Sequence, residues 1–254
     1  MASAVRALLA MLELELRRLR HDRMELYSRA VQPLLWIGVF GPIMGAIRAI
    51  PTGNVPYTSF ITPGVLIQST TFVSIFYGLI IVWERESGIL KKLLVTPASR
   101  YAIVIGRAMA SGVRAIFQAL IIVPIALLVG VRFVPNVGYF ALALVAIFLA
   151  SGGFAALSML IASFLKTRER FMGIGQAITF PLFFASNALY PVQMMPAVLQ
   201  AFARVNPMSY VVDAVRALLI TGDLQNLGLD ILAILAFNLV MFSLASANFR
   251  RIIE

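Results

Sequence analysis

The stretch TSFITPGVLIQSTTFVSIFYGLIIVWERESGILKKLLVTP, residues 58 to 97, joins a long apolar run to a short, charged segment. Residues 58 to 83 carry no charged side chain. Because an α-helix needs about 20 apolar residues to cross the hydrocarbon core of a bilayer, this run is long enough to span a membrane. The polarity changes abruptly at Glu84, Arg85 and Glu86. The stretch therefore predicts a spanning helix that ends in a charged segment at one membrane face.

The composition extends this interpretation to the whole chain. Of the 254 residues, 61% are hydrophobic and 13% are charged, whereas soluble domains have about half apolar and about a quarter charged residues. The chain is therefore expected to be an integral membrane protein. Its first residues carry charges at Arg6, Glu13 and Glu15 and do not resemble a cleaved signal peptide, so we expect this segment to be retained.

Long runs that contain few or no charges predict an all-α membrane fold with six spanning helices in a domain over 31–254. Turn-forming residues separate the first two runs (PTGNVP) and the third and fourth (VRFVPN). The predicted spans are residues 31–50, 58–83, 104–130, 137–164, 172–190 and 229–248.

The basic residues predict the orientation. Sixteen of the 21 Lys and Arg residues fall at the chain ends and in alternate loops, four fall in the other loops, and Arg114 lies within the third span. Since cytoplasmic loops are enriched in Lys and Arg, both termini should be cytoplasmic. The net charge of +10 thus describes topology, and nucleic-acid binding is not needed to explain it.

Residues 1–30 are too charged to span but have apolar residues at helical spacing, including Leu8, Leu12, Leu16 and Leu19. This pattern predicts an amphipathic helix on the cytoplasmic membrane surface. A solvated helical tail is the alternative.

The segment after Trp83 is also amphipathic. Ile89, Leu90, Leu93 and Leu94 form an apolar ridge, while Lys91 and Lys92 point elsewhere. Such a helix projecting from a membrane domain could dock a partner. Composition alone favours equally a basic loop that merely anchors the topology.

The chain lacks the residues that several classes of function require. The chain has no cysteine and a single histidine, His21, which excludes Cys-based metal sites and Ser-His or Cys-His catalysis within the apolar region. None of the three lysines belongs to a G-x-x-x-x-G-K-[ST] phosphate loop, so any ATP must be hydrolysed by another polypeptide. ASGGFAAL, residues 150–157, lies in the fourth span, where its small residues are typical of helix packing.

Three stretches carry a resemblance to a known family. They are ERESGILKKLLVTPASR (84–100), SNALYPVQMMPAVLQ (186–200) and NPMSYVVDAVRALL (206–219). The first resembles the family pattern E-R-E-x-G-x-L-x-x-L-x-V-T-P-x-S-R, with Lys91 where an acidic residue is common. The chain is similar to permeases of the ABC type-2 transporters, most of all to daunorubicin-resistance and nodulation-factor export permeases.

The resemblance implies a dimer of six-span halves in the bacterial cytoplasmic membrane, with a homodimer as the expected form. Two separate ATPase subunits that bind ATP and Mg would carry this dimer. It implies no cofactor and no enzyme activity in this chain, a connecting helix at the N-terminus, and short re-entrant helices on the outer side at 190–210. The loop 84–100 would be the coupling-helix loop. Its ATPase-docking residues would be Glu84, Arg85, Glu86, Gly88, Leu90, Lys91, Lys92, Leu93, Leu94, Thr96 and Pro97.

The family further implies a substrate path along the second and fifth spans. The candidate path residues are Gln68, Thr71, Gln176, Thr179, Phe180, Phe183 and Asn187. Aromatic and neutral polar side chains suit a hydrophobic or amphipathic drug-like molecule or lipid; a lipid-linked glycan or polysaccharide is the alternative cargo. For each of these residues, ordinary helix packing is an equally valid interpretation.

An ATP-independent secondary transporter belongs to a different class. Ion coupling usually places acidic groups near the bilayer midplane. Here no Asp or Glu lies centrally in a predicted span, and Asp230 lies at the start of the last one. Arg114, in the third span, could snorkel or line a cavity.

Overall fold

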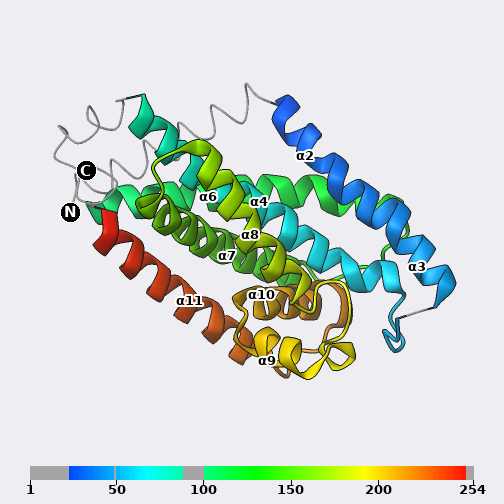
Figure 1. Ribbon diagram of the computed structural model, residues 1–254. Coiled ribbons are helices and arrows are strands. Elements are labelled where there is room, and N and C mark those ends of the chain that lie inside the picture. The colour runs from blue at the N-terminus through cyan, green and yellow to red at the C-terminus, as the bar shows by residue number, and fades with distance from the viewer. Residues whose placement is uncertain (1–22, 49, 88–99, 250–254) are drawn as a thin grey trace.

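The computed structural model describes residues 23–48, 50–87 and 100–249, and every regular element in these ranges is helical (Figure 1). The predicted all-α class is therefore confirmed for this part of the chain. Most of the predicted N-terminal surface helix and nearly all of the predicted coupling helix lie outside the described residues.

Five helical segments are long and apolar enough to cross a membrane. The first is Ser28–Ile47, which runs through α2 (Arg23–Leu35), the π-helical turn η1 (Trp36–Phe40) and α3 (Gly41–Ile47). The others are α4 (Tyr57–Glu86), the apolar part of α6 (Arg100–Leu128), α7 (Val137–Phe164) and α11 (Leu227–Asn248). These segments match five of the six predicted spans to within a few residues.

The predicted span at 172–190 corresponds to a shorter helix, α8 (Arg168–Phe184, 17 residues). It ends before Ala185, where the buried Asn206 side chain donates hydrogen bonds to the carbonyls of Leu182 (2.7 Å) and Ala185 (3.4 Å). A helix of this length extends about 26 Å, at the lower limit for crossing the hydrocarbon core. A sixth span therefore stays a prediction.

Helix α7 lies at the centre of the packing and contacts α4, α6 and α11. In its interior, the Ser151 hydroxyl is 2.6 Å from that of Ser74 on α4 and 2.8 Å from that of Ser111 on α6. Because all three hydroxyls are buried, these bonds join three helices without leaving polar groups unpaired. The assignment of residues 150–157 to helix packing is confirmed.

Close approach of α4 to α7 depends on Gly78. Its backbone N–H donates to the Ser158 hydroxyl at 3.0 Å, and that hydroxyl donates to the Ile75 carbonyl at 2.5 Å. A Cβ at Gly78 would lie 2.5 Å from the Ser158 carbonyl oxygen, closer than any packed side chain allows. The small residue therefore sets the distance between the two helices.

Arg114 lies inside the bundle. Its side chain is largely buried, and its guanidinium lies 5.9 Å from the centroid of the Tyr77 ring on α4. Of the two roles expected of Arg114, this buried position does not agree with snorkelling, and a place along a cavity stays a prediction.

Short helices gather at one end of the bundle, here called the α9–α10 end: η2 (Val192–Met194), α9 (Ala197–Val205), α10 (Pro207–Arg216) and the π-helical turn η3 (Ala217–Thr221). Figure 1 places α9 and α10 beside the start of α11, whereas the C-terminal end of α11 lies at the opposite end. Helix α10 starts with favourable capping, since the Asn206 side chain accepts the Met208 N–H at 3.0 Å and Pro207 needs no N–H partner. The predicted region 190–210 is thus built of short helices.

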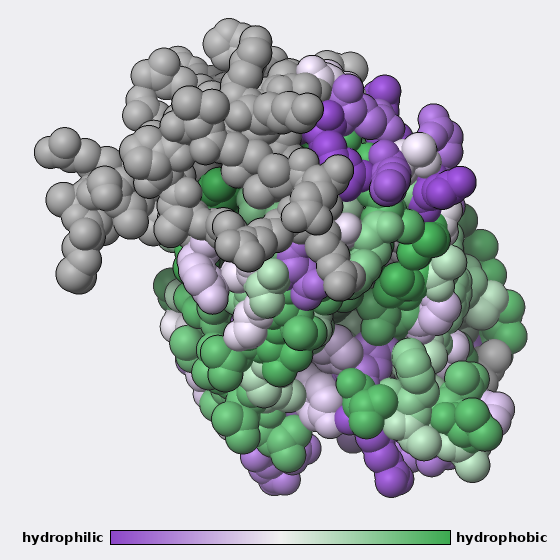
Figure 2. Space-filling model, turned by 60° about the vertical axis from the view of Figure 1, so that its left-hand side comes forward, coloured by the Kyte–Doolittle hydropathy of each residue, from purple (hydrophilic) through white to green (hydrophobic). Residues whose placement is uncertain are grey.

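Apolar side chains form a belt around the molecule. Figure 2 shows a mostly green surface between purple, hydrophilic residues at the top and bottom of the visible face. Leu232, Leu239 and Val240 on α11 are among many large apolar side chains that are exposed. Such a surface is too extensive for a protein in water, and with the five candidate spans it identifies a multi-pass membrane protein.

Candidate functional site

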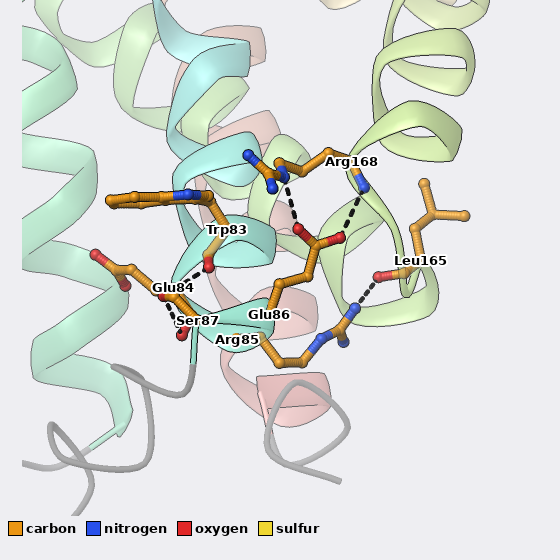
Figure 3. Close-up of polar contacts among 7 residues, drawn as sticks. All are labelled: Trp83, Glu84, Arg85, Glu86, Ser87, Leu165 and Arg168. Atoms are coloured by element: carbon orange, nitrogen blue, oxygen red, sulfur yellow. Dashed lines mark hydrogen bonds and ion pairs between the residues drawn. The ribbon is translucent and has the colours of Figure 1, made fainter.

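The C-terminal end of α4 is tied to the start of α8. Arg168 donates to the two carboxylate oxygens of Glu86, from its backbone N–H at 3.2 Å and from Nε at 2.6 Å (Figure 3). Half of the Arg168 side chain is exposed. This ion pair therefore positions the last turn of α4 more than it stabilises the fold.

Two further contacts involve neighbouring residues of α4. Glu84 forms an ion pair with Arg107 of α6, and Arg85 donates a hydrogen bond to the backbone carbonyl of Leu165, in the turn between α7 and α8. The last turn of α4 thus contacts α6 and both sides of the α7–α8 turn. We call this part of the bundle the basic end.

The predicted docking residues therefore divide into two groups. The charges of Glu84, Arg85 and Glu86 are engaged within the chain, so these residues hold the base of the predicted docking segment. The remaining eight predicted docking residues, between Gly88 and Pro97, lie outside the described residues.

The predicted substrate path is only partly assembled on one surface. A groove between α4 and α8 is lined mainly by apolar side chains, and it includes Gln176 and Thr179 from the predicted set. The Phe180 ring, 41% exposed, packs edge-on against Phe72 with 6.0 Å between ring centroids. These three residues of α8 are therefore brought together next to the groove.

Five of the seven predicted path residues are buried within the chain. One of them is Thr179, whose hydroxyl donates to the Gly175 carbonyl of its own helix at 2.7 Å. Gln68 and Thr71 on α4 are almost fully buried, as are Phe183 and Asn187. The Phe183 ring contacts the Trp36 ring at a centroid distance of 6.2 Å. Within the described chain these four side chains belong to the helix-packing alternative.

Sequence reasoning missed the apolar wall of the groove. Phe72, Ile75, Phe76 and Leu79 on α4 face Phe171, Met172 and Gly175 on α8. The signal was present, because positions 72, 75, 76 and 79 share one helix face. The path residues predicted on this helix were polar, and none of these four apolar positions was among them.

A second network at the α9–α10 end was also missed. The Arg216 side chain, 8% exposed, donates to the Asn187 carbonyl at 2.7 Å, to the Phe60 carbonyl at 3.3 Å and to Asp213 Oδ1 at 3.0 Å. Its guanidinium also lies 4.0 Å from the centroid of the Phe60 ring. The charge pattern placed Arg216 among the four basic residues of the other loops. In the structure, its side chain joins α10 to α4 and to the end of α8.

Burial disfavours the charged forms of Asp213 and Arg216, both of which lie outside the five candidate spans. It lowers the pKa of Arg216 to about 10, and the nearby Asp213 carboxylate opposes that shift. Burial likewise raises the pKa of Asp213, against the effect of Arg216. Arg216 therefore stays charged at neutral pH.

The chain matches the model of a known family over residues 6–220, which include both ends of the bundle and the α4–α8 groove. That family is described as ABC-2 type transporter. The chain belongs to this family.

Individual relatives agree with the family match. The putative transport permease ycf38 of Cyanophora paradoxa is 29% identical over 246 residues, covering 89% of this chain and 83% of the relative. The daunorubicin resistance ABC transporter permease protein DrrB1 of Streptomyces coeruleorubidus is 27% identical over 222 residues, covering 86% and 76%. Nodulation protein J of Rhizobium leguminosarum bv. trifolii is 24% identical over 228 residues, covering 89% and 86%.

The resemblance found in the sequence is thus confirmed. The chain is the permease subunit of an ABC exporter, which is a transport subunit, and its family implies partnership with an ABC ATPase. The motif at 206–219 now has a structural role, because its Asn206, Asp213 and Arg216 make the side-chain contacts of the α9–α10 end.

Proposed function

We propose that this permease forms a homodimer in the bacterial cytoplasmic membrane, with six spans per chain and both termini cytoplasmic. Two ATPase subunits, which bind the ATP and Mg, would dock on the segment 84–97 of the two copies. Their closure on ATP would drive alternating access and export of a hydrophobic or amphipathic molecule or lipid. The basic end, with Arg85, Arg107 and Arg168, would face the cytoplasm.

One observation supports this mechanism most strongly. Helix α4 carries the paired residues Glu84 and Glu86 at its end and one wall of the groove further along. A force on the docking segment would therefore act on α4 and, through Arg107 and Arg168, on α6 and α8. Rigid helices linked in this way suit a coupled movement of the groove walls.

The lining of the groove supports the choice of cargo. Phe72, Phe76 and Phe171 offer aromatic surface, and the exposed Gln176 offers a polar amide group. This balance is typical of sites for amphipathic molecules and less so for a polysaccharide. A relative named for daunorubicin resistance agrees with a drug-like cargo.

The proposal is tested by co-expressing the permease with the ATPase encoded next to it and purifying through a tag on the permease. We expect a complex with two copies of each subunit and vanadate-sensitive ATP turnover. A stable permease that captures no ATPase and still transports would overturn the proposal in favour of an ATP-independent transporter.

A sharper test changes the docking segment itself. Leu93→Asp with Leu94→Asp should abolish capture of the ATPase, because two charges replace the predicted apolar anchor, while membrane insertion is unaffected. Leu224→Asp, which changes an exposed leucine at the α9–α10 end, is the control and should capture normally. Unchanged capture by the double variant would show that the ATPase docks elsewhere.

The groove is tested by transport with Phe180→Ala and Gln176→Ala. Both side chains are exposed, so their truncation should reduce export without unfolding the protein. Normal export by both variants would remove the α8 side of the groove from the substrate path.

A further inference from the structure

A polar hollow of about 190 Å³ opens at the α9–α10 end, between α10, η3 and the start of α11. Three carboxylates line it, from Asp213, Asp223 and Asp230, together with Thr221, Asn226 and Arg216. It is separate from the apolar groove between α4 and α8, with which it shares no residue.

The single arginine in the lining cannot neutralise all three carboxylates. Arg216 donates to Asp213 Oδ1, and its other N–H groups donate to the carbonyls of Asn187 and Phe60. Its position is thereby fixed toward α4 and α10. Neither Asp223 nor Asp230 forms an ion pair with a residue of the described ranges.

Asp230 is the residue that points to a ligand. It is 3% exposed, and its carboxylate has no hydrogen bond or ion pair with any residue of the described ranges. A buried carboxylate without a partner is costly. The N-terminus of α11 offsets a part of this cost, since Asp230 lies in the first turn, but the effect of a helix dipole is small compared with a hydrogen-bonded counter-charge.

The chemistry of the hollow limits the class of ligand. Its carboxylates favour a cation that donates several hydrogen bonds. Within the described ranges, no group of three acidic or histidine side chains is close enough to hold a metal ion. The hollow is also much larger than the site of a bare ion, which needs oxygen ligands at about 2.0–2.6 Å. An ammonium group donates three hydrogen bonds, which suits a lining with several separate oxygen acceptors.

We propose that this hollow binds a primary ammonium group, carried by a soluble amine or by an aminated lipid headgroup, with Asp230 as its principal acceptor. Asp213 and Asp223 add further carboxylate acceptors, and Thr221 and Asn226 supply neutral polar contacts. This binding does not depend on the ATPase or on the proposed export cycle.

The test uses the purified full-length permease and n-butylammonium chloride, with binding followed by titration calorimetry. We expect saturable binding that weakens about tenfold in Asp230→Asn, the loss of roughly one charge-assisted contact. Glu169→Gln is the matched control, because it removes one negative charge from an exposed site on α8 and should bind as the wild type does. The neutral analogue n-butanol should not bind.

Asp223→Asn keeps the test informative if Asp230→Asn fails to fold. Asp223 is exposed, and an asparagine oxygen can still accept the Gln225 N–H that Asp223 Oδ1 accepts at 3.1 Å. This variant should also bind n-butylammonium more weakly. Equal affinity in both folded variants and wild type would overturn the proposal, as would binding of n-butanol at similar strength or binding of MgCl₂ in place of the amine.

Two lipid environments distinguish the sources of the ammonium group. In nanodiscs that contain phosphatidylethanolamine, a lipid occupant would compete and weaken n-butylammonium binding relative to phosphatidylcholine nanodiscs. Equal binding in both would identify a soluble amine as the occupant. Each result is consistent with the ammonium site, provided that Asp230→Asn lowers the affinity.

Discussion

Arginine joins helices at both ends of the bundle, but in different surroundings. At the basic end, Arg168 is half exposed and pairs with Glu86, which is also solvated. At the α9–α10 end, Arg216 is buried and engages one carboxylate, two backbone carbonyls and an aromatic ring. The Glu86–Arg168 contact can therefore break and re-form when the helices move, whereas the contacts of Arg216 fix the helices in place. The reason is that water can replace the partners of Arg168 but not those of Arg216.

The largest expected effect is at the buried end. Arg216→Ala leaves the buried carbonyls of Phe60 and Asn187 without their donor, and each buried acceptor left unpaired costs about 1–3 kcal/mol. The Asp213 side chain is 47% exposed, so the loss of its ion pair adds little. The apparent melting temperature in detergent should fall strongly. Arg204→Ala on α9 is the control, because this arginine is exposed. If both variants melt alike, the network of Arg216 does not stabilise the α9–α10 end.

An intermediate effect is expected for Glu84, whose ion pair with Arg107 is mostly shielded, the side chains being 15% and 13% exposed. Glu84→Gln should cost about 1.5 kcal/mol, the usual value for a hydrogen bond to a charged group. The same melting assay measures it. A loss of stability as large as that of Arg216→Ala would contradict the proposal that the α9–α10 end depends more strongly on its arginine than the basic end does.

The smallest effect on stability is expected for the Glu86–Arg168 pair. A double-mutant cycle with Glu86→Ala and Arg168→Ala should give a coupling free energy below about 1 kcal/mol. Transport should nevertheless suffer, since the pair joins α4 to α8. Full transport in both variants would show that this contact does not couple the helices.

The dependence on ionic strength provides a further test of the difference between the two ends. Raising the ionic strength to about 1 M shortens the screening length to about 3 Å and should weaken the exposed Glu86–Arg168 coupling. The destabilisation caused by Arg216→Ala should change little, because its network is buried. Equal salt sensitivity of the two measurements would contradict the assigned burial.

Sequence reasoning found five of the six predicted spans, because a long apolar run has few alternatives in a membrane protein. It also found the last turn of α4, since Glu84, Arg85 and Glu86 interrupt an apolar chain. It missed that these charges are paired within the chain, because their partners Arg107 and Arg168 are far along the sequence. It did not show that Phe183 and Gln68 are buried, since composition does not reveal which face of a helix is covered by its neighbours. Their place in the substrate path stays a prediction.

The sequence by itself determined that this protein is helical, spans a membrane several times and belongs to a family of transport permeases, because hydrophobic runs and local motifs are read without knowing the packing. The tertiary structure alone decided that α8 ends early at the Asn206 amide, that Arg216 is buried while Arg168 is solvated, and that Asp230 faces a polar hollow. These properties depend on distances between residues far apart in the chain, and local sequence patterns do not encode those distances.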